Sequence, residues 1–209
     1  MPARLSKIDE LTRLDHTFLE AGDECFYLGD YTSRRGFAFS EMNNLINNLR
    51  KPMDRRGRPE WRYKESAIVT CGRMLREALN EEWLAAATLV PIPSSKTRDD
   101  AGYDDRLPRI LREVSQGRQI DIRELAVMTR SVQQSHLAEE RVSIGELIES
   151  MSVAEAFTQP EPRTIGIVDD VLTTGRHFKA VQTVIRRRFP VVPIVGVFVA
   201  RRAAESTLP

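Results

Sequence analysis

The chain has 209 residues, 41% of them hydrophobic and 29% charged, and its 31 lysines and arginines nearly balance 30 aspartates and glutamates, giving a formal net charge of +1. This composition is typical of a globular protein and excludes collagen-like, low-complexity and strongly disordered classes. It also argues against a basic coat over the whole surface, although a balanced total can conceal segregated charged segments. The length predicts one domain, or one domain with an appended element.

The apolar segments are too short to span a membrane as a helix. The longest, at residues 191–200, is strand-sized and is interrupted by Pro193 and Gly196, whereas a spanning helix needs about 20 apolar residues. The first ten residues lack the apolar centre of a secretion signal. Cys25 and Cys71 are too far apart in sequence for a Cys-x-x-Cys metal site. We therefore expect a cytoplasmic protein that makes no membrane contact.

The N-terminal region is predicted to be helical, with one short strand. Apolar residues at steps of three and four predict amphipathic helices over residues 4–21 and 37–49. Strand-forming residues at 25–28 favour a short strand between them. His16 falls within the first helix and is expected at the surface.

A basic connector follows at residues 50–62. It holds six basic and two acidic side chains together with two prolines and a glycine, which is the chemistry of a loop. Such a run is most often solvated, but it leaves open a contact with nucleic acid or with a protein partner. We therefore divide the chain into an N-terminal region with its connector, residues 1–62, and a main domain, residues 63–209.

The main domain is predicted to be α/β. A helix over residues 65–82 is followed by short apolar runs without clean polar alternation, separated by helical stretches. Strands are expected at 88–92, 125–128, 164–168 and 193–200, and helices at 104–115, within 136–150 and at 176–189. Continuously apolar strands that alternate with helices predict a mostly parallel, twisted sheet flanked by helices on both faces.

The segment with the clearest chemistry is IVDDVLTTG at residues 167–175. An apolar strand leads to Asp169 and Asp170, and a Thr-Thr-Gly loop then opens an amphipathic helix, so the polar groups gather at the carboxyl end of a parallel strand. The N–H groups of a helix N-terminus suit a phosphate, and Gly175 would let the backbone approach it. The carboxylates suit sugar hydroxyls or a divalent cation shared with phosphates. The alternative is a purely structural Asp-capped turn.

This string resembles the phosphoribosyl pyrophosphate motif of type I phosphoribosyltransferases. The resemblance implies the fold of that family with an N-terminal hood, and it implies that Asp169 and Asp170 are catalytic, hold the ribose hydroxyls and bind Mg²⁺ directly or indirectly. The residues implied to bind ribose 5-phosphate are Asp169, Asp170, Val171, Leu172, Thr173, Thr174, Gly175, Arg176 and His177.

A second segment supports the same family. VPIPSSK at residues 90–96, together with GYDDR at 102–106, is most similar to the ComF-like branch, which is related to the amidophosphoribosyltransferases. The resemblance implies that Ser94, Ser95 and Lys96 bind pyrophosphate through hydroxyls, amides and a point charge. An exposed polar loop between a strand and a helix is the alternative.

The stretch at residues 128–157 resembles the flexible loop of ComF-like proteins and the strand after it. In phosphoribosyltransferases this loop closes over the active site, which would exclude water from a transition state that is otherwise hydrolysed. The candidate residues are Arg130, Gln134, His136 and Arg141. A solvated helix of mixed charge is the alternative.

The chain departs from the family pattern at three points. It lacks the Cys-rich zinc ribbon of many ComF-like proteins, and Thr173 stands where several members have an acid. His177 stands where Thr or Ser is common, so it would supply a ring N–H or a partial positive charge, or would simply face solvent.

The leading hypothesis is an enzyme that binds phosphoribosyl pyrophosphate, or another phosphorylated ribose, with Mg²⁺ and transfers the phosphoribosyl group to a nitrogen acceptor. The alternative is a non-catalytic module that senses a nucleotide or binds a partner, as a component of a DNA-uptake or defence-type complex. A phosphatase with an Asp nucleophile is a more distant alternative. The sequence leaves the acceptor open, as well as the oligomeric state, so an oligomer is allowed.

Overall fold

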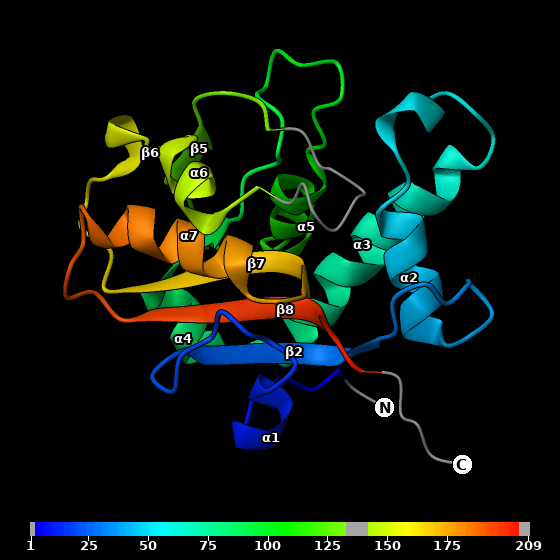
Figure 1. Cartoon of the computed structure of the whole chain (residues 1–209), viewed down its shortest axis with the longest axis horizontal. Helices are drawn as coiled ribbons and strands as arrows, with labels where there is room; N and C mark the ends of the chain where they lie inside the picture. The colour runs from blue at the N-terminus through cyan, green and yellow to red at the C-terminus, as the bar shows by residue number, and fades with distance from the viewer. Residues whose placement is uncertain (1–2, 133–141, 205–209) are drawn as a thin grey trace.

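The computed structural model describes residues 3–132 and 142–204. The fold is α/β, built on a six-stranded, mostly parallel sheet with strand order β1-β2-β8-β7-β3-β4 (Figure 1). The strands are β1 Ser6–Lys7, β2 Glu24–Tyr31, β3 Ala87–Pro91, β4 Asp121–Ile122, β7 Thr164–Leu172 and β8 Ile194–Arg202. Among these strands, β1 pairs antiparallel with β2, and the other pairings are parallel. This confirms the coarse prediction of an α/β fold with a mostly parallel sheet.

Helices flank this sheet because its central strands are apolar on both faces. Every residue of β7 after Thr164 is buried, so each face of that strand is covered. The helices are α1 Glu10–Arg13, α2 Glu41–Leu49, α3 Trp61–Ala78, α4 Glu81–Ala86, α5 Arg106–Val114, α6 Ile144–Glu149 and α7 Arg176–Arg186. Phe178 of α7 packs edge-on against Phe198 of β8, with ring centroids 6.1 Å apart. None of the helices described is long and apolar enough to cross a bilayer.

A small second sheet stands apart from the first. It pairs β5 (Ala126–Met128) with β6 (Met151–Val153) in antiparallel fashion. The apolar run at 125–128 was expected in the parallel sheet, and that expectation is wrong. A short apolar run has the same sequence pattern in a parallel sheet and in a separate antiparallel pair, so only the partner strand decides which sheet it joins.

The N-terminal region differs most from its prediction. The helix expected over 4–21 is replaced by β1, by the four-residue α1 and by a turn, and Leu11 and Leu14 are 79% and 77% exposed. His16, expected at the surface, is completely buried. Pairing of β1 with β2 and packing of residues 15–19 against the main body override the helical spacing, as tertiary contacts commonly do.

Strand β2 joins residues 1–62 to the main sheet. It is eight residues long, where a strand of four was expected, and it pairs with β8 from Glu24 to Tyr31. The N-terminal region therefore contributes two strands, β1 and β2, to the same sheet as the main domain. Figure 1 shows α2 and the connector beside α3 at the edge where the parallel strands end.

Candidate functional site

The centre of the candidate site is the junction of β7, a short loop and α7. The strand continues as far as Leu172, so Asp169 and Asp170 lie within it rather than after it. Gly175 ends the loop in the left-handed region, with φ of 83°, and starts α7. Such a φ is strained for any residue that carries a Cβ, which explains the glycine at this position.

Asp170 is fully buried and is held by two arginines. Its Oδ2 accepts hydrogen bonds from Arg50 Nε at 2.9 Å and Arg106 Nε at 2.8 Å, and its Oδ1 accepts one from Arg50 Nη2 at 2.5 Å. Burial alone would raise the pKa of Asp170, but the charges of Arg106 and Arg50 hold it far below its usual range. Three hydrogen bonds occupy most of the acceptor positions of this carboxylate.

Asp169 has different surroundings because successive side chains of a strand point to opposite faces. Its Oδ1 accepts a hydrogen bond from the backbone N–H of Asp170 at 2.8 Å, and the residue is 8% exposed. Burial and the neighbouring Asp170 carboxylate raise the pKa of Asp169 to about 7. Of the two acids, Asp169 is the one that retains acceptor capacity for a ligand.

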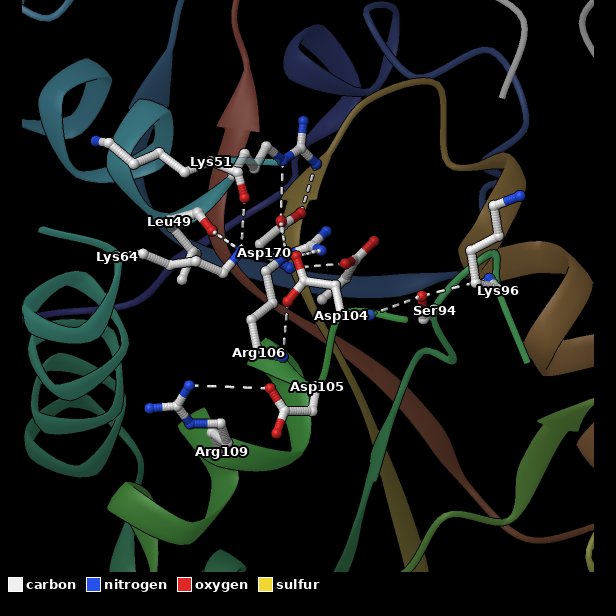
Figure 2. A network of polar contacts seen from close by, with 12 residues as sticks. Leu49, Lys51, Lys64, Ser94, Lys96, Asp104, Asp105, Arg106, Arg109 and Asp170 are labelled. Carbon is white, nitrogen blue, oxygen red and sulfur yellow. Dashed lines mark hydrogen bonds and ion pairs between the residues drawn. The ribbon is translucent and has the colours of Figure 1, made fainter. Parts of the chain in front are cut away.

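A buried lysine fixes the wall of the site formed by α2 and α5. Lys64 is 1% exposed, and its Nζ donates to the carbonyls of Leu49 and Lys51 and to Asp104 Oδ2, at 2.8, 3.0 and 2.7 Å. Asp104 also accepts from Arg106 Nη1 at 2.8 Å. Figure 2 shows these charges converging on Asp170. The chain of alternating charges therefore ties the connector to β7.

The loop places the residues predicted to hold a 5-phosphate at the edge of the sheet. Val171 and Leu172 are buried apolar residues of β7, while Thr173 and Thr174 are partly exposed in the loop. Among the described residues, no hydrogen-bond partner is found for the backbone N–H of Thr174 or of Gly175. Two N–H groups beside a helix N-terminus are suited to an anion.

Arg176 and His177 open α7. Arg176 donates from Nη1 to the Val142 carbonyl at 2.5 Å, which links α7 to the segment that precedes α6. His177 is exposed at the rim, yet partial removal from water by the surrounding protein and the positive charges of Arg176 and Arg50 lower its pKa to about 4. At neutral pH its ring is uncharged, so it can offer an N–H to a ligand but not a positive charge.

The loop predicted to bind pyrophosphate follows the strand next to β7. Strand β3 pairs in parallel with β7 up to Pro91 and Val168, so the two loops emerge at the same edge of the sheet. Ser94 Oγ accepts from the backbone N–H of Lys96 at 3.3 Å. Lys96 Nζ lies 3.6 Å from Asp100 Oδ2, and Figure 2 shows its side chain turned away from Asp170.

The predicted flexible loop is anchored to this second loop. The carbonyl of Ser95 accepts from the backbone N–H of Val132 at 2.8 Å, and Thr129 N donates to the Ser150 carbonyl at 2.8 Å, which brings the two ends of the segment together. Arg130 is exposed. The other three candidates, Gln134, His136 and Arg141, lie outside the described residues.

The donor set does not form a metal cage of its own. Within residues 3–132 and 142–204, no group of three or more His, Cys, Asp or Glu side chains could hold a metal ion. Asp170 already accepts hydrogen bonds from two arginines, which leaves Asp169 as a single carboxylate. This arrangement fits Mg²⁺ only if a ligand supplies phosphate oxygens, a common mode for this ion.

The basic connector borders a groove between α2 and α3. The groove has a volume of about 710 Å³ and is lined in part by Phe37, Asn44, Asn48 and Tyr63. Lys51 Nζ lies 5.1 Å from the centroid of the Phe37 ring and 5.5 Å from that of Tyr63. The connector therefore presents cations next to half-exposed aromatic rings beside this groove, and Arg62 stacks on Tyr63 in the same way.

Sequence reasoning missed four residues that shape this site. Arg106 lies in the GYDDR segment and Arg50 begins the basic connector, but no spacing rule pairs either with Asp170. Lys64 is buried although lysine is rarely so, and nothing in the sequence marks it. His16, the fourth, contacts the loop from a segment 157 residues away.

A scan against protein-family models found none that matches this chain, and a search of curated proteins found no match.

Proposed function

We propose that this chain is a type I phosphoribosyltransferase-like protein of the ComF-like branch. It binds phosphoribosyl pyrophosphate with Mg²⁺ and transfers the phosphoribosyl group to a nitrogen acceptor. The observation that carries the proposal is that the loops 94–96 and 173–175 follow adjacent parallel strands at the same edge of the sheet, with Asp169 near the end of β7. Open α/β sheets bind ligands at this edge.

The roles follow from what each group can offer. The N–H groups of Thr174 and Gly175 and the positive end of α7 receive the 5-phosphate. Asp169 accepts hydrogen bonds from ribose hydroxyls, while Asp170 holds Arg50 and Arg106 in place through hydrogen bonds. Ser94 and Ser95 would bind pyrophosphate, and Lys96 would join them by leaving its position beside Asp100.

The chemistry asked of the protein is positioning and charge stabilisation. The bond from the anomeric carbon to the pyrophosphate oxygen breaks, the bond from that carbon to the acceptor nitrogen forms, and the nitrogen gives up a proton to water or to the released pyrophosphate. Mg²⁺, held by pyrophosphate oxygens with Asp169, would neutralise charge on the leaving group.

Calorimetry with phosphoribosyl pyrophosphate and Mg²⁺ tests the binding step. The wild-type chain is expected to bind, and Asp169→Asn to bind at least tenfold more weakly, since it loses charge and acceptor strength at the ribose. Asp121→Asn is the matched control, because Asp121 pairs with Arg123 outside the site. No binding by the wild type, or equal binding by Asp169→Asn, overturns the proposal.

A second function is favoured by one observation: Asp170 is engaged by two arginines instead of facing a ligand. A chain of this kind can keep the phosphate cradle and sense a nucleotide, or bind a nucleic-acid or protein partner through the connector, without turnover. Pyrophosphate release on adding ammonia, amines or nucleobases separates the two. Turnover means an enzyme, whereas binding without turnover means a sensor.

A further inference from the structure

The loop at 173–175 is contacted by a segment from the other end of the chain. His16 Nδ1 hydrogen-bonds to the carbonyl of Thr173, and the backbone N–H of Phe18 donates to the carbonyl of Thr174 at 2.9 Å. These are consecutive carbonyls of the loop. We name residues 15–19 the N-terminal brace.

Fixing these carbonyls also fixes the N–H groups that the proposed function needs. In a trans peptide the C=O of one residue and the N–H of the next point in opposite directions across the same plane. The Thr173 carbonyl and the Thr174 N–H therefore point to opposite sides of the loop, as do the Thr174 carbonyl and the Gly175 N–H. With both carbonyls held by the brace, both N–H groups face away from it. A hydrogen bond accepted by a carbonyl also polarises the N–H of the same peptide group.

The His16 ring is chemically suited to donate one hydrogen bond to the Thr173 carbonyl. A carbonyl only accepts, so Nδ1 must carry the proton, and the neutral ring then has a bare Nε2. His16 is completely buried, and Nε2 has no hydrogen-bond partner among the described residues. A proton there would be a buried donor without an acceptor, which fixes the ring in its Nδ1–H form.

Further contacts hold the brace in register. Leu19 lies against Gly175 so closely that a Cβ on the glycine would meet Leu19 Cδ2 at 2.9 Å. Asp15 accepts from Arg201 of β8 at 3.0 Å, and the guanidinium carbon of Arg176 lies 5.9 Å from the centroid of the Phe18 ring. The brace is therefore fixed both to the sheet and to the first turn of α7.

We propose that the His16 side chain and the Phe18 backbone N–H are positioning groups that aim the Thr174 and Gly175 N–H groups at the phosphate of a phosphorylated ribose. This inference rests on the proposed function for its ligand, but its geometric part concerns the loop alone. It assigns a role in the site to an N-terminal segment that lies far along the chain from Asp169, Asp170 and the loop at 173–175.

Two substitutions at residue 16 separate the hydrogen bond from the packing. His16→Asn keeps an N–H donor near the position of Nδ1, whereas His16→Leu keeps apolar bulk without a donor. We expect His16→Leu to raise the dissociation constant for ribose 5-phosphate about three- to tenfold, and His16→Asn to stay within about twofold of the wild type. Ile185→Val serves as a control for general destabilisation, because Ile185 is buried near the far end of α7.

The second readout needs no ligand. Amide proton shifts and hydrogen exchange of Thr174 and Gly175 are measured by NMR in the full chain. We expect both to change in His16→Leu and to be largely restored in His16→Asn. In the wild type, the ring nitrogens of His16 should show a protonated Nδ1 and a bare Nε2.

The outcomes distinguish failure of the brace from failure of the proposed function. If the wild type and His16→Leu bind ribose 5-phosphate equally, the brace is overturned and the proposed function stands. Absence of binding by the wild type overturns the proposed function, and the amide readout then decides the brace. Unchanged Thr174 and Gly175 amides in a folded His16→Leu protein overturn the brace in either case.

Discussion

Arg106 Nε lies 2.8 Å from Oδ2 of Asp170, which joins the first residue of α5 to the buried end of β7. The same carboxylate receives two further hydrogen bonds from Arg50. Asp170 is therefore an internal counter-ion for the two arginines. Its loss should be felt by the whole fold, and not only by a bound substrate.

Replacing Asp170 by asparagine should destabilise the protein. Asp170→Asn leaves Arg50 and Arg106 without their shared carboxylate, but both arginines retain some contact with water, at 36% and 22% exposure. We expect the free energy of unfolding to fall by about 2–3 kcal/mol, below the value for a fully buried pair. Urea unfolding of both proteins at pH 7 measures this loss in the free energy of unfolding.

The difference in unfolding free energy between the wild type and Asp170→Asn depends on pH in a definite direction. The folded-state pKa of Asp170 is lowered, so its stabilisation is present above the unfolded pKa of about 3.9 and is lost as the pH falls below it. The gap between wild type and Asp170→Asn should narrow only below about pH 4. Asp121→Asn, at a more exposed pair, should cost less than about 1 kcal/mol. Equal costs for the two variants would contradict this account.

Lys64→Met should also destabilise the fold. Methionine has nearly the same length but cannot donate to the carbonyls of Leu49 and Lys51 or pair with Asp104. The two carbonyls lose a buried donor, and the Asp104 carboxylate loses one of its two cations but keeps Arg106, so we expect a loss of about 2–4 kcal/mol in the free energy of unfolding. Arg73→Met, at an exposed position on the same helix, should change it by less than about 0.5 kcal/mol.

Gly175→Ala should weaken both the fold and phosphate binding. The φ of 83° is unfavourable for alanine, and the new Cβ would meet Leu19 at 2.9 Å. We expect a lower melting temperature. Gly175→Ala should cost less in a Leu19→Ala background than in the wild type, because the smaller side chain relieves the steric part of the penalty. Gly36→Ala is the control, since a Cβ at Gly36 meets nothing within 4 Å. A melting temperature equal to that of the wild type would contradict the observed turn geometry.

The two described histidines near the loop should make the protein less stable in mild acid. Burial lowers the pKa of His16, although its bond to Thr173 opposes this. Partial removal from water and nearby arginines lower the pKa of His177 to about 4. The unfolded chain takes up protons near pH 6.5 while the folded chain resists, so unfolding becomes easier as the pH falls from about 6.5 towards 4.

Urea unfolding at pH 7.5 and pH 5 checks this effect in wild type, His16→Asn and His177→Gln. Each variant should lose less stability than the wild type on acidification. Asp169 works in the opposite direction, because its pKa is raised to about 7 and protonation favours the folded state. The three proteins are therefore compared with one another at each pH, because all of them share the contribution of Asp169. An identical decline in all three proteins would contradict the prediction.

The sequence by itself determined the elements whose signal is local. The apolar strands β3, β7 and β8 follow from residue spacing, as do helices α5 and α7 between them and the parallel sheet that the strands build. The glycine that turns β7 into α7 was also readable, because few other residues fit a tight approach there.

Only the tertiary structure decided the partners of charged and polar side chains. The pairing of Asp170 with Arg50 spans 120 residues, and that of His16 with Thr173 spans 157, so no periodicity along the chain encodes either contact. The N-terminal segment shows the same limit. Its residue spacing suits a helix, but pairing with β2 and packing against the loop at 173–175 stabilise it more than a single exposed amphipathic helix would be stabilised. Local pattern fixes where strands and helices can form, and long-range burial fixes which charges meet.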